Sequence, residues 1–200
     1  MNETLYRVSA NPHVRDKSST QSIMLDVILA LLPATVFGIY IFGASAAVTI
    51  AVSIVTCVAA EYIYQKLMKQ KVSVSDLSAA VTGLLLALNL PAGVPFWMPV
   101  LGGLFAIIVV KQVFGGLGQN FMNPALGARC FLMISFAARM TTFTYDGVTT
   151  ATPLALLKAG KSVDLGSVFT GFIPGTIGET SAVLLLLGGA YLVLKKVISP

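Results

Sequence analysis

The sequence predicts an all-α integral membrane protein with about six transmembrane helices, some of them short or broken. Apolar residues make up 56% of the 200 residues and charged residues only 10%, against about 25% in an average soluble protein. Apolar runs fill most of the chain, and the thirteen Lys and Arg stand at their edges. This composition excludes a disordered tail, a secreted disulfide scaffold and an ordinary cytosolic enzyme, and it makes the lipid bilayer the expected surrounding. No basic patch interleaved with aromatic residues is present for nucleic acid.

The apolar runs set the expected domain organisation. Residues 1–22 are polar and predict a cytoplasmic N-terminal arm, because no apolar run begins before Ile23. A transmembrane domain then covers 23–200, with expected spans at 24–42, 44–64, 77–90, 97–114, 126–139 and 182–194. Pro33 should kink the first span. The third span is short and ends on Asn, Pro and Gly, which indicates a half-helix or a tilted span at membrane depth.

The basic residues predict an orientation. With the N-terminus inside and every span threaded in turn, nine Lys and Arg fall on inner segments and three on outer ones. The inner ones are Arg7, Arg15, Lys17, Lys66, Lys69, Lys71, Lys111, Lys195 and Lys196, and the outer ones are Arg139, Lys158 and Lys161. This bias predicts both termini on the cytoplasmic side and a loop over 141–180 on the outer face. About six spans with both ends inside also suit part of an inverted-repeat bundle.

Acidic side chains inside the runs need partners, because burying a charge in a membrane is costly. Asp26 and Glu61 stand near the inner ends of the first two spans. We expect them to lie at the interface or to pair with Lys66 or Arg15, and a role in a cation pathway is the alternative.

Lys111 and Arg129 flank an irregular stretch at 115–125 that contains the amides of Asn120 and Asn123. Irregular backbone at membrane depth is tolerated where it is buried in protein or lines a cavity. One interpretation is a simple cytoplasmic turn. The other is a binding loop in which two basic groups and exposed amides hold a flat, anionic or electron-rich ligand.

The outer segment contains a short helix start at Thr152-Pro153. A residue before proline is biased to extended geometry, and proline suits the first turn of a helix. Thr152 is therefore expected to cap a helix that begins at Pro153.

The same loop also resembles a cofactor-attachment motif. The run from Asp146 to Thr152, Asp-Gly-x-Thr-Thr-Ala-Thr, resembles the flavinylation motif of the membrane subunits of Rnf and Na⁺-pumping quinone reductase complexes. The resemblance implies that Thr152 carries FMN through a phosphoester bond. It also implies that Asp146, Thr149 and Ala151 guide a flavin transferase and take no part in electron transfer themselves.

Other segments extend this resemblance over essentially the whole chain. Residues 115–126 resemble the family's GG-x-G-x-N-x-x-NPA signature, residues 175–182 its G-x-x-GET-S-A segment, and residues 22–34 its start. The resemblance is closest to the RnfD type. It implies a urea-transporter-like bundle, and the chain is similar to about the first two thirds of a family member.

The resemblance implies a membrane subunit of an Rnf-type ferredoxin:NAD⁺ oxidoreductase complex in the cell inner (cytoplasmic) membrane. Such a subunit, not catalytic alone, carries electrons across the membrane through covalent FMN, coupled to Na⁺ or H⁺ translocation. Implied partners are the other subunits, including an outer-face FMN subunit, and a flavin transferase. A second, non-covalent flavin (riboflavin or FMN) is also implied, and the loop with Asn120 and Asn123 is the expected place for it.

Two other functions remain open at this stage. The broken spans also suit a membrane channel or transporter without a redox cofactor. A structural subunit that only holds other redox proteins is the third reading. Hydrolytic chemistry is not expected, because the only histidine, His13, lies in the polar arm, and no motif for a metal site is present.

Overall fold

A computed structural model of the chain describes residues 19–145, 148–149, 151–179 and 181–199. The fold in these residues is helical, apart from a hairpin of two-residue strands, β1 and β2, which pair antiparallel. In chain order the elements are α1 (Thr20–Phe42), α2 (Ala44–Leu67), η1 (Val74–Asp76), α3 (Ser78–Leu88), α4 (Trp97–Leu104), the π-helical η2 (Phe105–Gln112), α5 (Pro124–Ser135), α6 (Ala137–Met140), β1 (Thr144–Tyr145), β2 (Val148–Thr149), α7 (Pro153–Lys158), α8 (Leu165–Thr170) and α9 (Ala182–Leu194).

The two longest helices, α1 and α2, are long and apolar enough to cross a membrane. α1 begins inside the predicted arm, because Ser19 and Ser22 cap it reciprocally, and it continues through Pro33. It ends at Gly43, whose positive φ of 68° lets the chain turn at once into α2. Both helices expose large apolar side chains such as Val36 and Val55, as lipid-facing helices do.

The other apolar helices are shorter. Two of them bear on spans that the sequence predicts. The 11 residues of α3 span about 16 Å, roughly half of a hydrocarbon core of about 30 Å. The expected span at 126–139 is broken at Phe136, which separates α5 from α6. The third span is thus short, as the sequence predicts, whereas its half-helix interpretation, the count of about six spans and the inverted repeat stay predictions.

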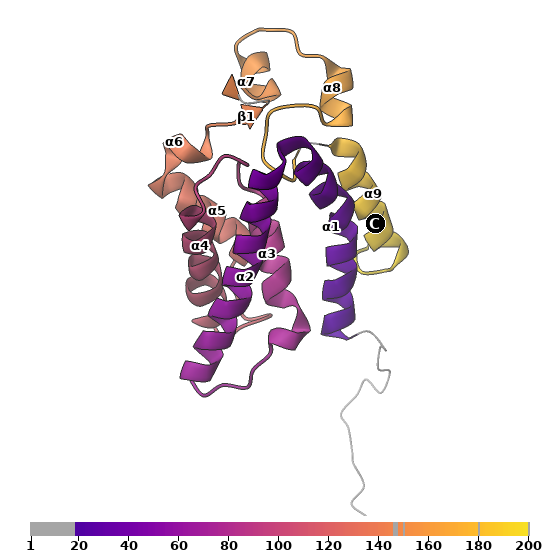
Figure 1. The fold of residues 1–200 in the computed structure, drawn as a ribbon. Coiled ribbons are helices and arrows are strands. Elements are labelled where there is room, and N and C mark those ends of the chain that lie inside the picture. Colours follow the sequence, from indigo (N-terminus) through magenta and orange to yellow (C-terminus); the bar gives the residue numbers. More distant parts are fainter. Residues whose placement is uncertain (1–18, 146–147, 150, 180, 200) are drawn as a thin grey trace, which may run out of the picture.

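Successive helices alternate in direction, so the loops gather at two ends of the molecule (Figure 1). One end holds the α1–α2 turn, the α3–α4 connection, the β1–β2 hairpin, α7 and α8. The other end holds the start of α1, the α2–α3 connection and the stretch 113–123. This separation agrees with the predicted order of inner and outer loops. Which end faces the cytoplasm stays a prediction.

The helices pack closely at glycine residues, which have no side chain to hold the backbones apart. A Cβ on Gly83 of α3 would lie 2.7 Å from the Cα of Ile54 in α2, so the two backbones touch. Ser53 reinforces this contact, since its hydroxyl donates to the carbonyl of Gly83 at 2.7 Å. The paired helices form the framework on which the remaining segments rest.

An irregular segment between α8 and α9 enters the helix bundle. The amide of Ile177 donates to the carbonyl of Leu90 at 3.0 Å, and that of Gly178 donates to Leu88 at 2.9 Å. These bonds satisfy carbonyls at the broken end of α3, and the Ile177 side chain is fully buried. Part of the predicted outer loop therefore forms packed structure against α3, which fixes the residues on either side of Ile177.

Candidate functional site

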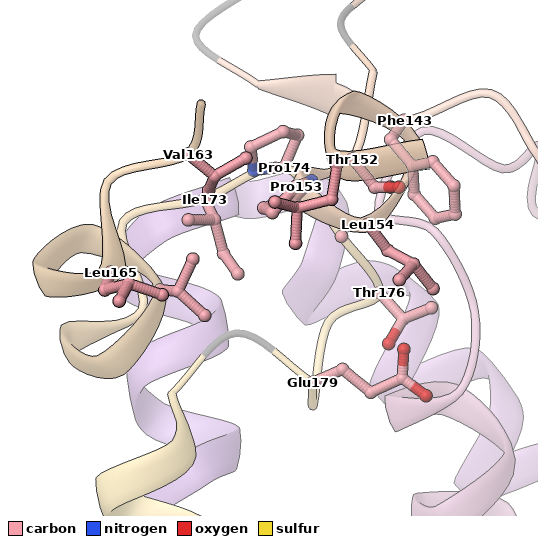
Figure 2. Close-up of a pocket in the computed structure, with 13 residues that line it drawn as sticks. Phe143, Thr152, Pro153, Leu154, Val163, Leu165, Ile173, Pro174, Thr176 and Glu179 are labelled. Atoms are coloured by element: carbon pink, nitrogen blue, oxygen red, sulfur yellow. The ribbon is translucent and has the colours of Figure 1, made fainter. Parts of the chain in front are cut away.

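A cavity of about 470 Å³ lies beneath α7 and α8 (Figure 2). We call it the Thr152 cavity, and its lining residues are Phe143, Thr152, Pro153, Leu154, Leu157, Val163, Leu165, Val168, Ile173, Pro174, Gly175, Thr176 and Glu179. Most of these side chains are apolar, and only a few polar groups interrupt them. Its volume and its lining are typical of a pocket for a small organic ligand, which a mostly apolar wall encloses and a few polar groups orient.

Thr152 adopts the capping role that the sequence predicts. Its backbone is extended, with φ −65° and ψ 155°, and Pro153 occupies the first turn of α7. The side-chain oxygen accepts a hydrogen bond from the amide of Ala155 at 3.3 Å, which is long for such a bond. The hydroxyl is thus held only weakly while it borders the cavity, where an attached group would have room.

The other residues of the predicted flavinylation motif have different positions. Ala151 is exposed directly before Thr152, and Thr149 lies in β2. Asp146 lies outside the described residues. The hairpin and the start of α7 thus present Thr152 at the end of the molecule predicted to face outward (Figure 1).

Polar groups occupy the lower end of the Thr152 cavity. Thr176 is only 3% exposed, and its hydroxyl has no hydrogen-bond partner in the part of the chain that the structure describes. The carboxylate of Glu179 accepts a bond from the guanidinium of Arg129 at 3.1 Å. Arg129 also donates to Oδ1 of Asn89 at 2.6 Å, so α5 and the end of α3 hold this pair in place.

The lining residues of the Thr152 cavity fit a flavin phosphate ester. A hydroxyl stands where a phosphoester would begin, and the apolar walls suit a flat aromatic ring. An orphaned buried hydroxyl indicates a missing partner, because nearly all buried polar groups in proteins are hydrogen-bonded. Thr152 would hold the phosphate, and Thr176 and Glu179 are the polar groups available to the rest of the ligand.

A second cavity of about 350 Å³ lies toward the opposite end of the molecule. Lys111, Asn120 and Asn123 line it together, so these three predicted site residues are neighbours. Asn123 also caps α5, because its Oδ1 accepts the amide of Ala125 at 3.0 Å. Oδ1 of Asn120 is buried without a hydrogen-bond partner among the described residues. We call this the Lys111 cavity.

Arg129 does not belong to the same group as Lys111, which corrects the expectation from the sequence. It is absent from the lining of the Lys111 cavity and pairs instead with Glu179 beside the Thr152 cavity. Asn123 is the N-cap of α5, and Arg129 follows six residues later, about 9 Å along the helix. That rise and the helical rotation carry Arg129 to the other site.

The ammonium of Lys111 is bound in a buried polar network. Its Nζ lies 2.7 Å from Oε2 of Glu61 and 2.6 Å from the hydroxyl of Ser78. The other carboxylate oxygen of Glu61 accepts amide hydrogens from Gln112 at 3.0 Å and Gln65 at 3.2 Å. Lys111 and Glu61 are 2% and 1% exposed, so this ion pair is almost wholly shielded from solvent.

This network corrects the prediction about Glu61. The sequence predicts Glu61 at the interface with Lys66 or Arg15 as its partner, but it is buried against Lys111, and Lys66 lies over the ring of Tyr62. Asp26 accepts a bond from the hydroxyl of Tyr191 in α9 at 2.8 Å. The partner of Glu61 is distant in sequence, whereas the local charge pattern points to nearer basic residues. Arg15 lies outside the described residues, so its pairing with Asp26 stays a prediction.

Several site residues are not identified from the sequence. Thr176 and Glu179 belong to the segment 175–182, which stands out as a motif without a role for any member. Asn89 is expected only as part of a helix end, yet it fixes Arg129. Polar residues next to glycines in an apolar chain are the signal that would have found them. Among the described residues, no group of three His, Cys, Asp or Glu side chains is arranged to hold a metal ion.

Comparison with known proteins gives consistent matches. A family model described as the NQR2, RnfD, RnfE family matches residues 7–200. The D subunit of the Na(+)-translocating ferredoxin:NAD(+) oxidoreductase complex of Acetobacterium woodii is 52% identical over 100% of this chain and 65% of its own length. The proton-translocating counterpart of Clostridium ljungdahlii is 41% identical over 98% of this chain and 65% of its length. The D subunit of the ion-translocating oxidoreductase complex of Rhodobacter capsulatus is 34% identical, over 96% and 64%. The chain thus spans 64–65% of the length of these relatives.

Proposed function

Because the chain belongs to the NQR2, RnfD, RnfE family, we propose that it is the membrane subunit of an Rnf-type ferredoxin:NAD⁺ oxidoreductase complex. In this role it carries electrons across the cytoplasmic membrane and takes part in Na⁺ or H⁺ translocation, together with the other subunits of the complex. The relatives with 52% and 41% identity support this proposal, since they are named as D subunits of a Na⁺-translocating and a proton-translocating ferredoxin:NAD⁺ oxidoreductase complex respectively. The apolar surfaces of α1 and α2 support a place in the bilayer.

The proposed cofactor is FMN joined to Thr152 by a phosphoester. The observation that carries this proposal is that Thr152 lines a cavity of about 470 Å³ with an orphaned hydroxyl at its other end. When bound, FMN supplies reversible one- and two-electron chemistry, while the protein supplies position and surroundings. Thr152 keeps the cofactor at one place independently of its affinity, and the apolar wall limits access of water to it.

The proposed orientation puts Thr152 on the outer face of the membrane. There a flavin transferase would modify it with the help of Asp146, Thr149 and Ala151, and an outer-face FMN subunit would be the neighbour in the complex. The positive charges on the opposite loops support this orientation.

The Lys111 cavity is the proposed place for a second, non-covalent flavin, riboflavin or FMN. Lys111, Asn120 and Asn123 line it, and the unpartnered Oδ1 of Asn120 offers an acceptor to a ligand. Arg129 lies elsewhere and is assigned to the Thr152 cavity. An Asn120→Ala variant should lose non-covalent flavin from the purified complex, and unchanged total flavin would contradict this assignment.

The test of the covalent cofactor compares denatured bands on a gel under ultraviolet light. The chain is produced in a host that contains a flavin transferase, as wild type, Thr152→Ala and the control Thr170→Ala. Thr170 lies in the exposed end of α8 outside the cavity, so its loss should leave the fluorescent band unchanged. Thr152→Ala should be dark. A dark wild-type band would refute the proposal and favour a channel or transporter without a redox cofactor.

A further inference from the structure

The side chain of Thr176 is held rigidly at the lower end of the Thr152 cavity. Its neighbour Ile177 donates to the carbonyl of Leu90 at 3.0 Å, and Gly178 donates to Leu88 at 2.9 Å. Thr176 itself pairs with Pro91 in an isolated bridge, and its β-branched side chain has few rotamers. Thr176 is only 3% exposed and lines the cavity, so a ligand there would supply the hydrogen-bond partner that its hydroxyl lacks among the described residues.

Glu179 is the second polar group at this end of the cavity. Its amide donates to the carbonyl of Thr176 at 3.3 Å, which places the two residues on one turn. Arg129 donates to its carboxylate at 3.1 Å and to Asn89, while Asn89 donates to the carbonyl of Leu85 at 2.8 Å. This chain of bonds holds the carboxylate in place as an acceptor. In Figure 2 the oxygens of both side chains lie at the same end of the cavity, below Thr152.

A hydrogen-bond donor beside an acceptor is the complement of one edge of a flavin ring. The pyrimidine half of isoalloxazine carries an N–H group between two carbonyl oxygens, so it offers a donor and an acceptor side by side. The Glu179 carboxylate accepts and the Thr176 hydroxyl donates, which matches this edge. The apolar lining around Leu154 and Ile173 suits the opposite, hydrocarbon half of the ring.

We propose that Thr176 and Glu179 bind the pyrimidine edge of the flavin that Thr152 anchors, and that they set its redox potential. This inference rests on the proposed function, because it requires FMN on Thr152. The hydroxyl of Thr176 donates to a ring carbonyl and stabilises the electron-rich reduced ring. The carboxylate of Glu179 has the opposite effect, because a negative charge beside the ring opposes the addition of electrons.

The test measures the midpoint potential of the covalent flavin in the full-length subunit. Spectra of Thr152→Ala are subtracted, so that only the anchored flavin contributes to the titration. The variants are Thr176→Val, which keeps the shape and removes the hydroxyl, Thr176→Ser, which keeps the hydroxyl, and Glu179→Gln. Thr170→Val is the matched control, because Thr170 is exposed in α8 and does not line the cavity.

We expect opposite shifts from the two positions. Thr176→Val should lower the midpoint potential by about 30 mV, which corresponds to a tenfold change in the redox equilibrium constant of a two-electron couple. Glu179→Gln should raise it, whereas Thr176→Ser and Thr170→Val should stay at the wild-type value.

The outcomes that overturn this inference differ from the one that refutes the proposed function. Fluorescent bands with potentials unchanged in Thr176→Val and Glu179→Gln would overturn the inference and leave covalent FMN intact. Equal shifts in the control and in Thr176→Val would also overturn it, since they would show a general disturbance. A dark wild-type band would refute the proposed function, and the inference with it.

Discussion

Replacing Lys111 by methionine should destabilise the helix bundle, because it leaves the carboxylate of Glu61 buried without its counter-ion. The substitution removes the 2.7 Å ion pair with Glu61 and the 2.6 Å hydrogen bond to Ser78. Loss of one partner of a buried ion pair costs about 3–5 kcal/mol. Gln112 and Gln65 still donate to Glu61, so we expect the lower end, about 3 kcal/mol.

The assay is reversible unfolding in mixed micelles, followed by helical circular dichroism, for a double-mutant cycle. Lys111→Met, Glu61→Gln and the double variant are compared with wild type. The double variant should recover most of the loss, because a neutral amide beside methionine leaves no buried charge. Lys66→Met is the control: Lys66 is exposed over Tyr62, and its loss should change the unfolding free energy by no more than about 0.5 kcal/mol.

The result that would refute this reasoning is a Lys111→Met variant as stable as the Lys66→Met control. Such a result would mean that Glu61 is not charged in the folded protein, since burying a carboxylate without a counter-ion always costs free energy. A double variant whose destabilisation equals the sum of the two single destabilisations would show that the two side chains are not coupled.

Three further predictions follow from the local geometry. Gly83→Ala should destabilise by about 1–3 kcal/mol in the same unfolding assay, since a Cβ there lies 2.7 Å from the Cα of Ile54; unchanged stability would contradict the close contact. Asn123→Ala should lower thermal stability by about 1 kcal/mol through loss of the α5 cap, and a melting temperature equal to wild type would contradict the cap. Hydrogen bonds from the hydroxyl and amide of Ser167 lower the pKa of the exposed Asp164 below 3.8. The α8 cap is therefore fully present above pH 3.8 and is lost as the pH falls through the lower folded pKa. The protection of the α8 amides, measured relative to their intrinsic exchange rates, should fall only there; protection that does not change with acidification would contradict the cap.

Local features of the chain could be predicted from sequence because short-range chemistry decides them. The cap at Thr152 follows from a threonine before a proline, and the shortness of α3 follows from Asn, Pro and Gly at its end. The membrane character follows from the scarcity of charge. The prediction of the cofactor came from the family resemblance, because neither residue spacing nor composition indicates a flavin.

Long-range pairings could not be predicted, because the partners are separated by many residues. Lys111 and Glu61 are 50 positions apart, as are Arg129 and Glu179. Lys66 is only five residues from Glu61 and is the nearer partner in sequence. The fold instead brings Lys111 next to the buried carboxylate of Glu61. The entry of the segment around Ile177 into the bundle is likewise set by the unsatisfied carbonyls at the end of α3.

The central claim is that Thr152 carries a flavin phosphoester, and peptide mass spectrometry tests it most directly. The chain is isolated from a host that contains a flavin transferase, digested, and the peptide that includes Thr152 is fragmented. The account predicts a peptide heavier by FMN less one water, with the added mass on Thr152. An unmodified peptide, or a flavin on another residue, would contradict it.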